Sequence, residues 1–272
     1  MGRTLAVTAA DEAFVPLLEG LLGSLRQWES TPIDDLACFD LGLSRSSRSR
    51  VASQTRFLVK PAWDLPVDKE TRARKPAYRA LTVRPFLRDY FPGYDVYLWL
   101  DADLWVQRKA ALGAYVKGAS TKGLAVATQS HPAYVHQTSV VRQRVFHLRS
   151  YYGPQGAEPL EVEAYYNAGV FALGASAPHW TAWARSFRAG LERTGGSLVN
   201  DQTAINHAIW HGRLPVEALD ARFNWCCHLA APFFDRIRRR FLEPVEKGRP
   251  LGIIHMTAHT KRETRLRFRP KP

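Results

Sequence analysis

The chain has 272 residues, of which 46% are hydrophobic, and it carries a formal net charge of +13. This length and composition allow a full buried core and exclude a disordered chain, while the basic excess predicts an anionic partner. The cysteines show no paired spacing, which argues against a disulfide framework or a structural zinc site and favours a reducing compartment. They are Cys38, Cys226 and Cys227.

The apolar stretches of the sequence indicate neither a signal peptide nor a membrane span. The N-terminal apolar run soon reaches Asp11 and Glu12, so it predicts a first strand rather than a signal peptide. No uninterrupted stretch of about 18 apolar residues occurs, so no membrane-spanning helix is expected. We therefore expect a cytoplasmic protein, either free or peripheral to the inner face of the membrane.

The first hundred residues alternate predicted strands and helices. The predicted elements are a strand at 3–8, a helix at 16–25, strands at 34–43 and 57–60, a helix at 78–91 and a strand at 96–100. Polar stretches at 44–50 and 65–75 are expected to be surface loops. This order predicts the parallel half of an α/β sheet. The small-residue turn at 9–12 lies where such folds bind nucleotides, although no GxGxxG is present.

The strand at 96–100 leads directly into Asp101-Ala102-Asp103. Its continuous apolar run is typical of a strand buried on both faces. Two carboxylates at the carboxyl end of such a strand are costly unless a cation pairs with them, and this edge is where α/β proteins bind ligands. Divalent cations accept carboxylate oxygens and often bring a substrate diphosphate. A metal site for a nucleotide diphosphate and simple capping of the next turn both remain open.

The second half continues with predicted strands at 124–128, 165–173 and 251–255, and with helices at 180–191 and 200–210. The segment 131–154 is aromatic and basic without a clear period, so we expect a lid or an acceptor-side loop. Asn167-Ala168-Gly169 interrupts a strand, which indicates a bulge or the close approach of a ligand. Asp201 opens a helix, where it would also complement the helix dipole.

Five stretches together resemble the GT-A glycosyltransferases, and specifically glycosyltransferase family 8, which includes glycogenin and bacterial lipooligosaccharide galactosyltransferases. In the family's order they are VTAADEAF, VYLWLDADLWV, YYNAGVFAL, NDQTAIN and IIHMTAHTK. The resemblance implies an α/β fold of GT-A type, Rossmann-like, with a central mostly parallel sheet flanked by helices. It implies one domain over 1–261, with a nucleotide-binding half to about 106 and an acceptor-side half beyond it, and leaves 262–272 as a basic tail.

The resemblance also implies a metal-dependent transfer of a hexose from a nucleotide sugar, with uridine diphosphate as the expected carrier, and with retention of anomeric configuration. Asp101, Asp103 and His255 would hold Mn²⁺ or Mg²⁺, and a nitrogen ligand beside two carboxylates suits Mn²⁺. Lys261 would add a second positive charge at the diphosphate. Gln202 or, less well, Asp201 would lie on the reactive face, where a front-side displacement lets the leaving phosphate take the acceptor's proton.

The remaining donor contacts follow from the same resemblance. Ala9 and Asp11 would contact the nucleoside, although Asp11 is equally placed to cap the following helix. Arg84 would lie near the donor sugar, and Lys75 and Arg79 are weaker candidates. The full donor-binding set is Ala9, Asp11, Arg84, Asp101, Ala102, Asp103, Asn167, Ala168, Asp201, Gln202, His255 and Lys261.

Three features depart from the family pattern. Ala258 replaces a glycine after the histidine, Arg262-Glu263 replaces a proline-tryptophan pair, and Pro85 interrupts the pattern around Arg84. Two other classes remain as alternatives. A haloacid-dehalogenase-like phosphatase also uses an apolar strand that ends in DxD, with the first Asp as nucleophile. A non-catalytic basic binding protein would explain the charge but not the five stretches.

The expected partners are a nucleotide sugar and a glycan or lipid-linked acceptor. No nucleic-acid-binding motif accompanies the arginine clusters, so nucleic acid is not expected. The basic tail at 262–272 contains Phe268 among arginines and could rest on an anionic membrane face. A basic face that is merely solvated remains equally open.

Overall fold

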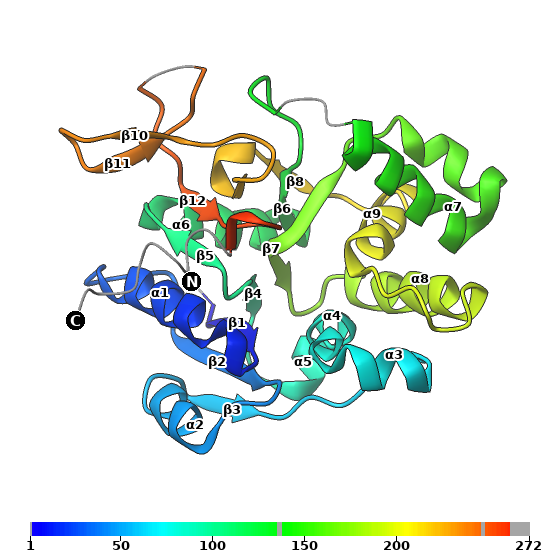
Figure 1. The fold of residues 1–272 in the computed structure, drawn as a ribbon, viewed down its shortest axis with the longest axis horizontal. Coiled ribbons are helices and arrows are strands. Elements are labelled where there is room, and N and C mark those ends of the chain that lie inside the picture. The colour runs from blue at the N-terminus through cyan, green and yellow to red at the C-terminus, as the bar shows by residue number, and fades with distance from the viewer. Residues whose placement is uncertain (1, 135–137, 246–247, 262–272) are drawn as a thin grey trace.

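The computed structural model describes residues 2–134, 138–245 and 248–261. A seven-stranded sheet in the order β3-β2-β1-β4-β7-β6-β8 lies between two layers of helices (Figure 1). Its strands are β1 (Thr4–Ala10), β2 (Asp35–Asp40), β3 (Phe57–Val59), β4 (Val96–Leu100), β6 (Leu124–Thr128), β7 (Tyr166–Gly174) and β8 (Glu217–Leu219). The strands from β3 to β4 are mutually parallel, and β7 runs antiparallel to both of its neighbours. The mostly parallel α/β sheet is therefore confirmed.

Alternating side chains of the central strand fill two separate cores. Tyr97 and Trp99 of β4 pack on one face, and Val96, Leu98 and Leu100 pack on the other. The first core is covered by α4 (Arg79–Thr82), α5 (Leu87–Tyr90), α8 (His179–Arg193) and α9 (Asp201–His211). The second core is covered by α1 (Val15–Arg26) and α6 (Lys109–Lys122). The prediction that this strand is buried on both faces is confirmed.

Two smaller sheets lie beside the main one. The first, in the order β5-β12-β9, contains β5 (Leu104–Val106), β12 (Ile253–His255) and β9 (Trp225–Cys226). The second is a hairpin of β10 (Phe233–Asp235) and β11 (Arg240–Leu242). Single-turn helices η1 (Glu12–Phe14), η2 (Pro76–Tyr78), η3 (Arg84–Phe86) and η4 (Ala221–Phe223) complete the connections.

Two predicted loops are wrong because each contains a residue that caps a short helix. The loop predicted at 44–50 contains α2 (Arg45–Ala52), and the Ser44 side chain accepts a hydrogen bond from the amide of Ser47. The loop predicted at 65–75 contains α3 (Lys69–Arg74), which Asp68 caps in the same way through Thr71. Such caps satisfy amides at the start of a helix that have no partner within it.

Two other segments differ from expectation in their helical content. The segment predicted as a lid or loop at 131–154 is largely helical in α7 (Thr138–Glu161), with a kink at Gly153. The helix predicted at 78–91 is split into α4, η3 and α5. Pro85 in η3 cannot donate a backbone hydrogen bond, which accounts for the interruption.

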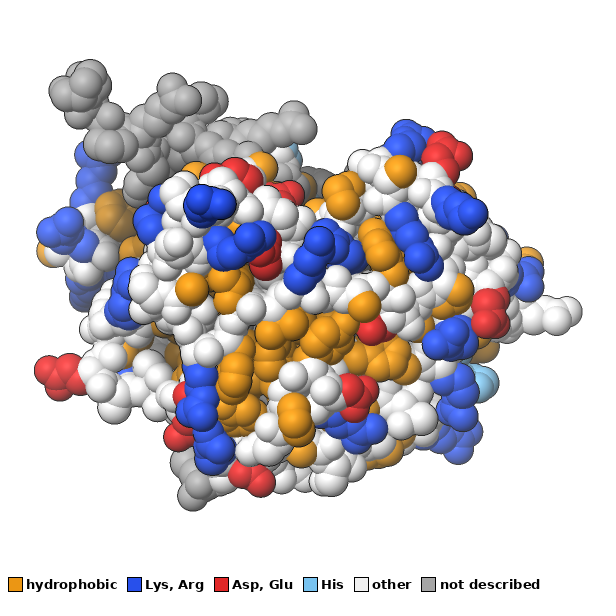
Figure 2. All heavy atoms as spheres, turned by 90° about the horizontal axis from the view of Figure 1, so that it is seen from below, with side chains coloured by type: hydrophobic (Ala, Val, Ile, Leu, Met, Phe, Trp, Pro, Cys, Tyr) orange, Lys and Arg blue, Asp and Glu red, His pale blue; other side chains and the backbone are white. Residues whose placement is uncertain are grey.

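The surface and the tail bear on the expected partners. In the view of Figure 2, lysine and arginine side chains lie scattered around a central apolar area rather than merged into one basic patch. Within the described residues, no helix combines the length and apolarity needed to cross a bilayer. The basic tail predicted at 262–272 lies outside the described residues. The division of 1–261 into nucleotide-binding and acceptor-side halves stays a prediction.

Candidate functional site

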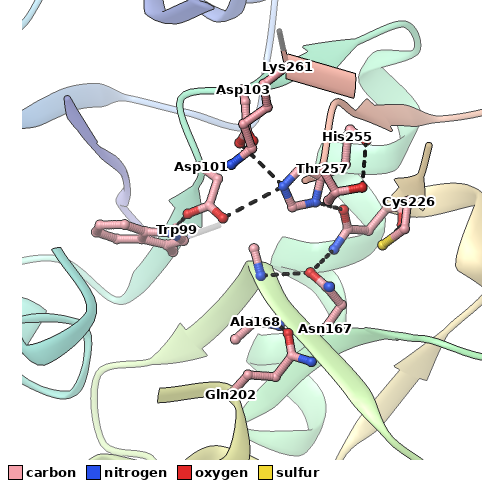
Figure 3. A network of polar contacts seen from close by, with 12 residues as sticks. Trp99, Asp101, Asp103, Asn167, Ala168, Gln202, Cys226, His255, Thr257 and Lys261 are labelled. Atoms are coloured by element: carbon pink, nitrogen blue, oxygen red, sulfur yellow. Dashed lines mark hydrogen bonds and ion pairs between the residues drawn. The ribbon is translucent and has the colours of Figure 1, made fainter. Parts of the chain in front are cut away.

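A cluster of two carboxylates and one imidazole forms where β4 ends. Asp101 and Asp103 follow β4, and His255 is the last residue of β12, which pairs antiparallel with β5 so that His255 lies opposite Leu104. One ligand atom of each of the three side chains lies within 4.8 Å of the others (Figure 3). The spacing and the nitrogen-plus-carboxylate composition suit a divalent transition metal.

The charges within the cluster are balanced by a lysine. His255 Nε2 lies 3.3 Å from Asp103 Oδ1 and 3.7 Å from Asp101 Oδ2, and Lys261 Nζ lies 2.7 Å from Asp103 Oδ2. Burial alone would raise the pKa of Asp103, but the positive charges of His255 and Lys261 outweigh it and hold that pKa well below its usual range. Burial likewise opposes protonation of His255, yet Asp103 raises its pKa to about 10.

A chain of amides fixes the orientation of the imidazole. His255 Nδ1 lies 2.9 Å from Asn224 Oδ1, which leaves Nε2 to face the carboxylates. The Asn224 amide donates to Asn167 Oδ1 at 2.9 Å, and the backbone N–H of Gly169 donates to the same oxygen at 2.9 Å. Partners of this kind hold the tautomer and direction of a metal-ligating histidine.

Gly169 provides the space in which these groups meet. A Cβ atom at this position would lie 2.2 Å from His255 Cε1 and 2.9 Å from both Asp101 Oδ2 and Asn167 Oδ1. The pairing of β7 with β6 shifts register here, from Val126–Phe171 to Ala127–Asn167. The interruption predicted in this strand is therefore confirmed as an irregularity, and it brings the backbone against the cluster.

A buried arginine joins the cluster to the start of α9. The Arg84 guanidinium donates to Asp101 Oδ1 and to Asp201 Oδ2, each at 2.5 Å, and to the Ala168 carbonyl at 3.1 Å. It also lies 4.6 Å from the centre of the Trp99 ring, whose indole N–H donates to Asp101. Burial raises the pKa of Asp201, and the charge of Arg84 opposes that rise. Arg84 thus pairs with two carboxylates at once.

Gln202 lies beside Asp201 and contacts the same strand. Its Oε1 accepts from the Ala168 amide at 3.2 Å, and its Nε2 donates to Gln129 Oε1 at 3.3 Å. Asn200 caps α9 through the Thr203 amide, which positions Asp201 and Gln202 in the first turn. Most of the predicted donor-binding residues are therefore brought together around β4, β7, α9 and β12.

Three candidates have other local contacts. Asp11 caps η1 by accepting from the Phe14 amide, so its capping geometry is observed. The Phe14 ring lies 5.2 Å from Lys261 Nζ, which still brings the loop after Ala9 near the cluster. Lys75 donates to the Tyr78 hydroxyl, and Arg79 donates to the carbonyls of residues 41, 61 and 76. Within the part of the chain that the structure describes, neither Lys75 nor Arg79 contacts the cluster.

Sequence reasoning missed three polar partners of the site. They are Trp99, Gln129 and Asn224. Asn224 interrupts the apolar stretch FNWCCHL, and a polar side chain inside such a stretch usually has a specific partner when buried. Ala258, where the resemblance predicts a glycine, has a φ of 52°, a left-handed conformation in which glycine is favoured.

The chain was compared with known proteins by sequence and by structure. No protein-family profile matches the chain, and no curated protein matches it by sequence. By structure, the chain is similar to the galactosyltransferase LgtC in complex with donor and acceptor sugar analogs, with 19% identity, coverage of 98% of this chain and 97% of that one, and a TM-score of 0.57.

Two further solved glycosyltransferases are similar to this chain in structure. Mouse xyloside xylosyltransferase 1 in its apo form shows 13% identity, coverage of 99% of both chains and a TM-score of 0.55. The bifunctional glycosyltransferase WbbM shows 13% identity over 81% of this chain and 39% of that one, with a TM-score of 0.52. The chain therefore has the fold of the GT-A glycosyltransferases.

Proposed function

We propose that this protein is a metal-dependent glycosyltransferase that moves a hexose from a uridine diphosphate sugar to a glycan or lipid-linked acceptor, with retention of configuration. The observation that carries the proposal is the cluster of Asp101, Asp103 and His255, within 4.8 Å of one another, in a GT-A fold. Lys261 beside this cluster adds the positive charge that a diphosphate requires.

The residues present fit a divalent ion. Two carboxylates and an oriented imidazole are suitable ligands, Gly169 leaves room beside them, and Asn224 supports the histidine. Mn²⁺ is the preferred candidate, with Mg²⁺ as the other. When bound, such an ion stabilises negative charge on the departing diphosphate. Lys261, which is half-buried and attached through a flexible side chain, can turn from Asp103 to the same phosphates.

Arg84 fixes two carboxylates on the side of the site where the donor sugar would bind. It holds Asp101 and Asp201 in fixed positions and occupies an oxygen of each carboxylate. Asp201, buried against this guanidinium, is poorly placed to act as a free nucleophile. Asn167, Ala168 and Gln202 then line the adjacent wall, where an amide can accept from or donate to sugar hydroxyls.

A front-side displacement fits these constraints. The acceptor oxygen forms a bond to the anomeric carbon as the bond from that carbon to the phosphate oxygen breaks, and the acceptor's proton passes to the leaving phosphate. Gln202 would orient the reacting groups from the same side. In LgtC, to which this chain is similar in fold, a glutamine-to-glutamate substitution is described as an active-site mutation.

A phosphatase that uses Asp101 as nucleophile is less well supported. Asp101 Oδ1 accepts hydrogen bonds from both Arg84 and Trp99, so it is not a free nucleophile. The fold is also that of glycosyltransferases rather than phosphatases. The remaining alternative, a non-catalytic basic binding protein, is an outcome of the experiment below.

Sugar release from a panel of nucleotide sugars tests the proposal. We expect the wild type to hydrolyse one donor slowly with Mn²⁺ or Mg²⁺ and to stop when the metal is chelated. Asp103→Asn should lower the rate at least about 100-fold, because loss of a metal ligand removes charge stabilisation of the leaving group. Asp89→Asn, which changes an exposed carboxylate, is the matched control. If no donor is consumed under any condition, the binding-protein alternative is favoured instead.

A further inference from the structure

The hairpin of β10 and β11 combines exposed apolar and basic side chains at some distance from the candidate site. It projects from the body of the molecule at the upper left of Figure 1. Ile237, at its tip, is 95% exposed, and Phe233 and Phe234 on β10 are each 44% exposed. The basic side chains of the tip and of β11 are Arg236, Arg238, Arg239 and Arg240, against one carboxylate at Asp235.

The tip is held in an ordered turn, which keeps Ile237 pointing outward. Asp235 Oδ1 accepts hydrogen bonds from the amides of Ile237 and Arg238, each at 3.0 Å, and Arg239 has a φ of 49°. The base of the hairpin is also fixed. Gln107 Nε2 donates to the Phe241 carbonyl at 2.8 Å, and the Phe241 amide donates to Gln107 Oε1. An apolar side chain is therefore presented to solvent by a braced support.

We propose that this hairpin docks on an anionic lipid bilayer, with Ile237 entering the interface and the arginines contacting phosphate headgroups. Apolar side chains flanked by cations match the boundary between acyl chains and headgroups, and each cation near such a surface adds attraction. A soluble polyanion would contact the arginines but would not bury the apolar side chain of Ile237 at the tip.

The base of the hairpin is connected to the candidate site through Gln107 and β5. Gln107, which clamps β11, directly follows β5, and β5 pairs with the strand that carries His255. Docking through the tip would therefore hold the metal-ligand cluster at a fixed height and orientation above the bilayer. Docking by these exposed side chains does not require glycosyl transfer.

Vesicle co-sedimentation of the full chain tests the proposal. We expect binding to phosphatidylcholine vesicles that contain phosphatidylglycerol, little binding to phosphatidylcholine alone, and weakening at high salt. Ile237→Ser and the double variant Arg236→Glu/Arg239→Glu should each reduce binding about tenfold or more. Because these side chains are exposed, the thermal unfolding temperature should not change. All measurements use the chain with its basic C-terminal residues present.

Matched controls separate the hairpin from general exposure and charge. Val162→Ser removes another exposed aliphatic side chain (89% exposed), and Arg185→Glu/Arg188→Glu makes the same charge change on α8. Both controls should bind like the wild type. The proposal is overturned if the hairpin variants bind as well as the controls, or if only the charge variant loses binding while Ile237→Ser is unaffected. Absence of wild-type binding to anionic vesicles would overturn it as well.

Discussion

Gly169 shows how one missing side chain shapes the candidate site. The position lies in β7 at the register shift, and the backbone there passes against His255 and Asp101. Any side chain would displace the imidazole from the carboxylates, since 2.2 Å is far below van der Waals contact. The glycine is thus part of the geometry that brings the three potential ligands within reach of one ion.

Gly169→Ala should therefore abolish Mn²⁺ binding and cost about 1–3 kcal/mol of unfolding free energy, as overpacking of a core does. Mn²⁺ binding is measured by electron paramagnetic resonance and stability by urea unfolding. Gly174→Ala on the same strand is the control, because the nearest atom to its added Cβ lies at 3.4 Å, close to ordinary contact. Unchanged Mn²⁺ affinity in Gly169→Ala would contradict this view of the cluster.

Arg84 sets the electrostatic balance between Asp101 and Asp201. Arg84→Met should lower the free energy of unfolding by about 3–5 kcal/mol, because it leaves two carboxylates facing each other without compensation. Adding Asp201→Asn should recover part of the loss, and urea unfolding at neutral pH measures both effects. Arg88→Met, at a half-exposed arginine nearby, should cost less than about 1 kcal/mol. Equal losses in Arg84→Met and Arg88→Met would argue against the bridging role.

At the level of elements, strands with long apolar runs were the most predictable part of the fold. The stretch 96–100 has five consecutive apolar and β-forming residues, which favour a strand buried on both faces, and the two carboxylates that follow it indicate the site. His255 and Lys261 followed from the family resemblance, which gives their spacing after the last strand. The local pattern thus indicates Asp101 and Asp103, whereas His255 depends on the resemblance.

Other elements depend on contacts that the local sequence does not reveal. The α2 sequence RSSRSRVA has a low hydropathy, and its capping residue Ser44 is held by Glu12, which lies 32 residues earlier. Asn224 likewise lies 31 residues before the histidine that it orients. Tertiary contacts of this kind stabilise α2 and orient His255. They leave no periodic pattern in the sequence from which they could be predicted.

In the loop after β12, Ala258 has a φ of 52°, at the position where the resemblance to glycosyltransferase family 8 predicts a glycine. An L-residue is strained in this conformation by about 1–2 kcal/mol, although glycine gains more entropy on unfolding. Ala258→Gly should therefore leave stability unchanged or raise it by up to about 1 kcal/mol in thermal unfolding. Ala189→Gly, at an exposed position inside α8, should instead lose about 1 kcal/mol. Equal destabilisation by both substitutions would contradict the strain.

For the molecule as a whole, buried neutral histidines predict acid sensitivity. Burial lowers the pKa of His179 to about 4, against the hydrogen bond to the Pro215 carbonyl, which favours its charged form. Burial and the charge of His211 lower the pKa of His207 to about 4 as well. Since protons bind the unfolded chain more readily, the stability contributed by each is present above pH 6.5 and is lost as pH falls toward 4.

His179→Gln should weaken this pH dependence while keeping a donor for Pro215. Between pH 7 and pH 4 the wild type should lose about 2–3 kcal/mol more unfolding free energy than the variant, from the difference between the folded and unfolded pKa. Urea unfolding at several pH values measures the slope. His259→Gln, at an exposed histidine, is the control. Identical slopes in the wild type and His179→Gln would rule out the buried histidine as a source of acid sensitivity.

The central claim is that the cluster at the end of β4 binds a metal ion together with a nucleotide diphosphate. Isothermal titration with uridine diphosphate, in Mn²⁺ and then in excess chelator, tests it most directly. We predict one saturable site that requires Mn²⁺, is lost in Asp103→Asn and is unchanged in Asp89→Asn. Binding that survives chelation and the Asp103→Asn change, or no binding in any condition, would contradict the account.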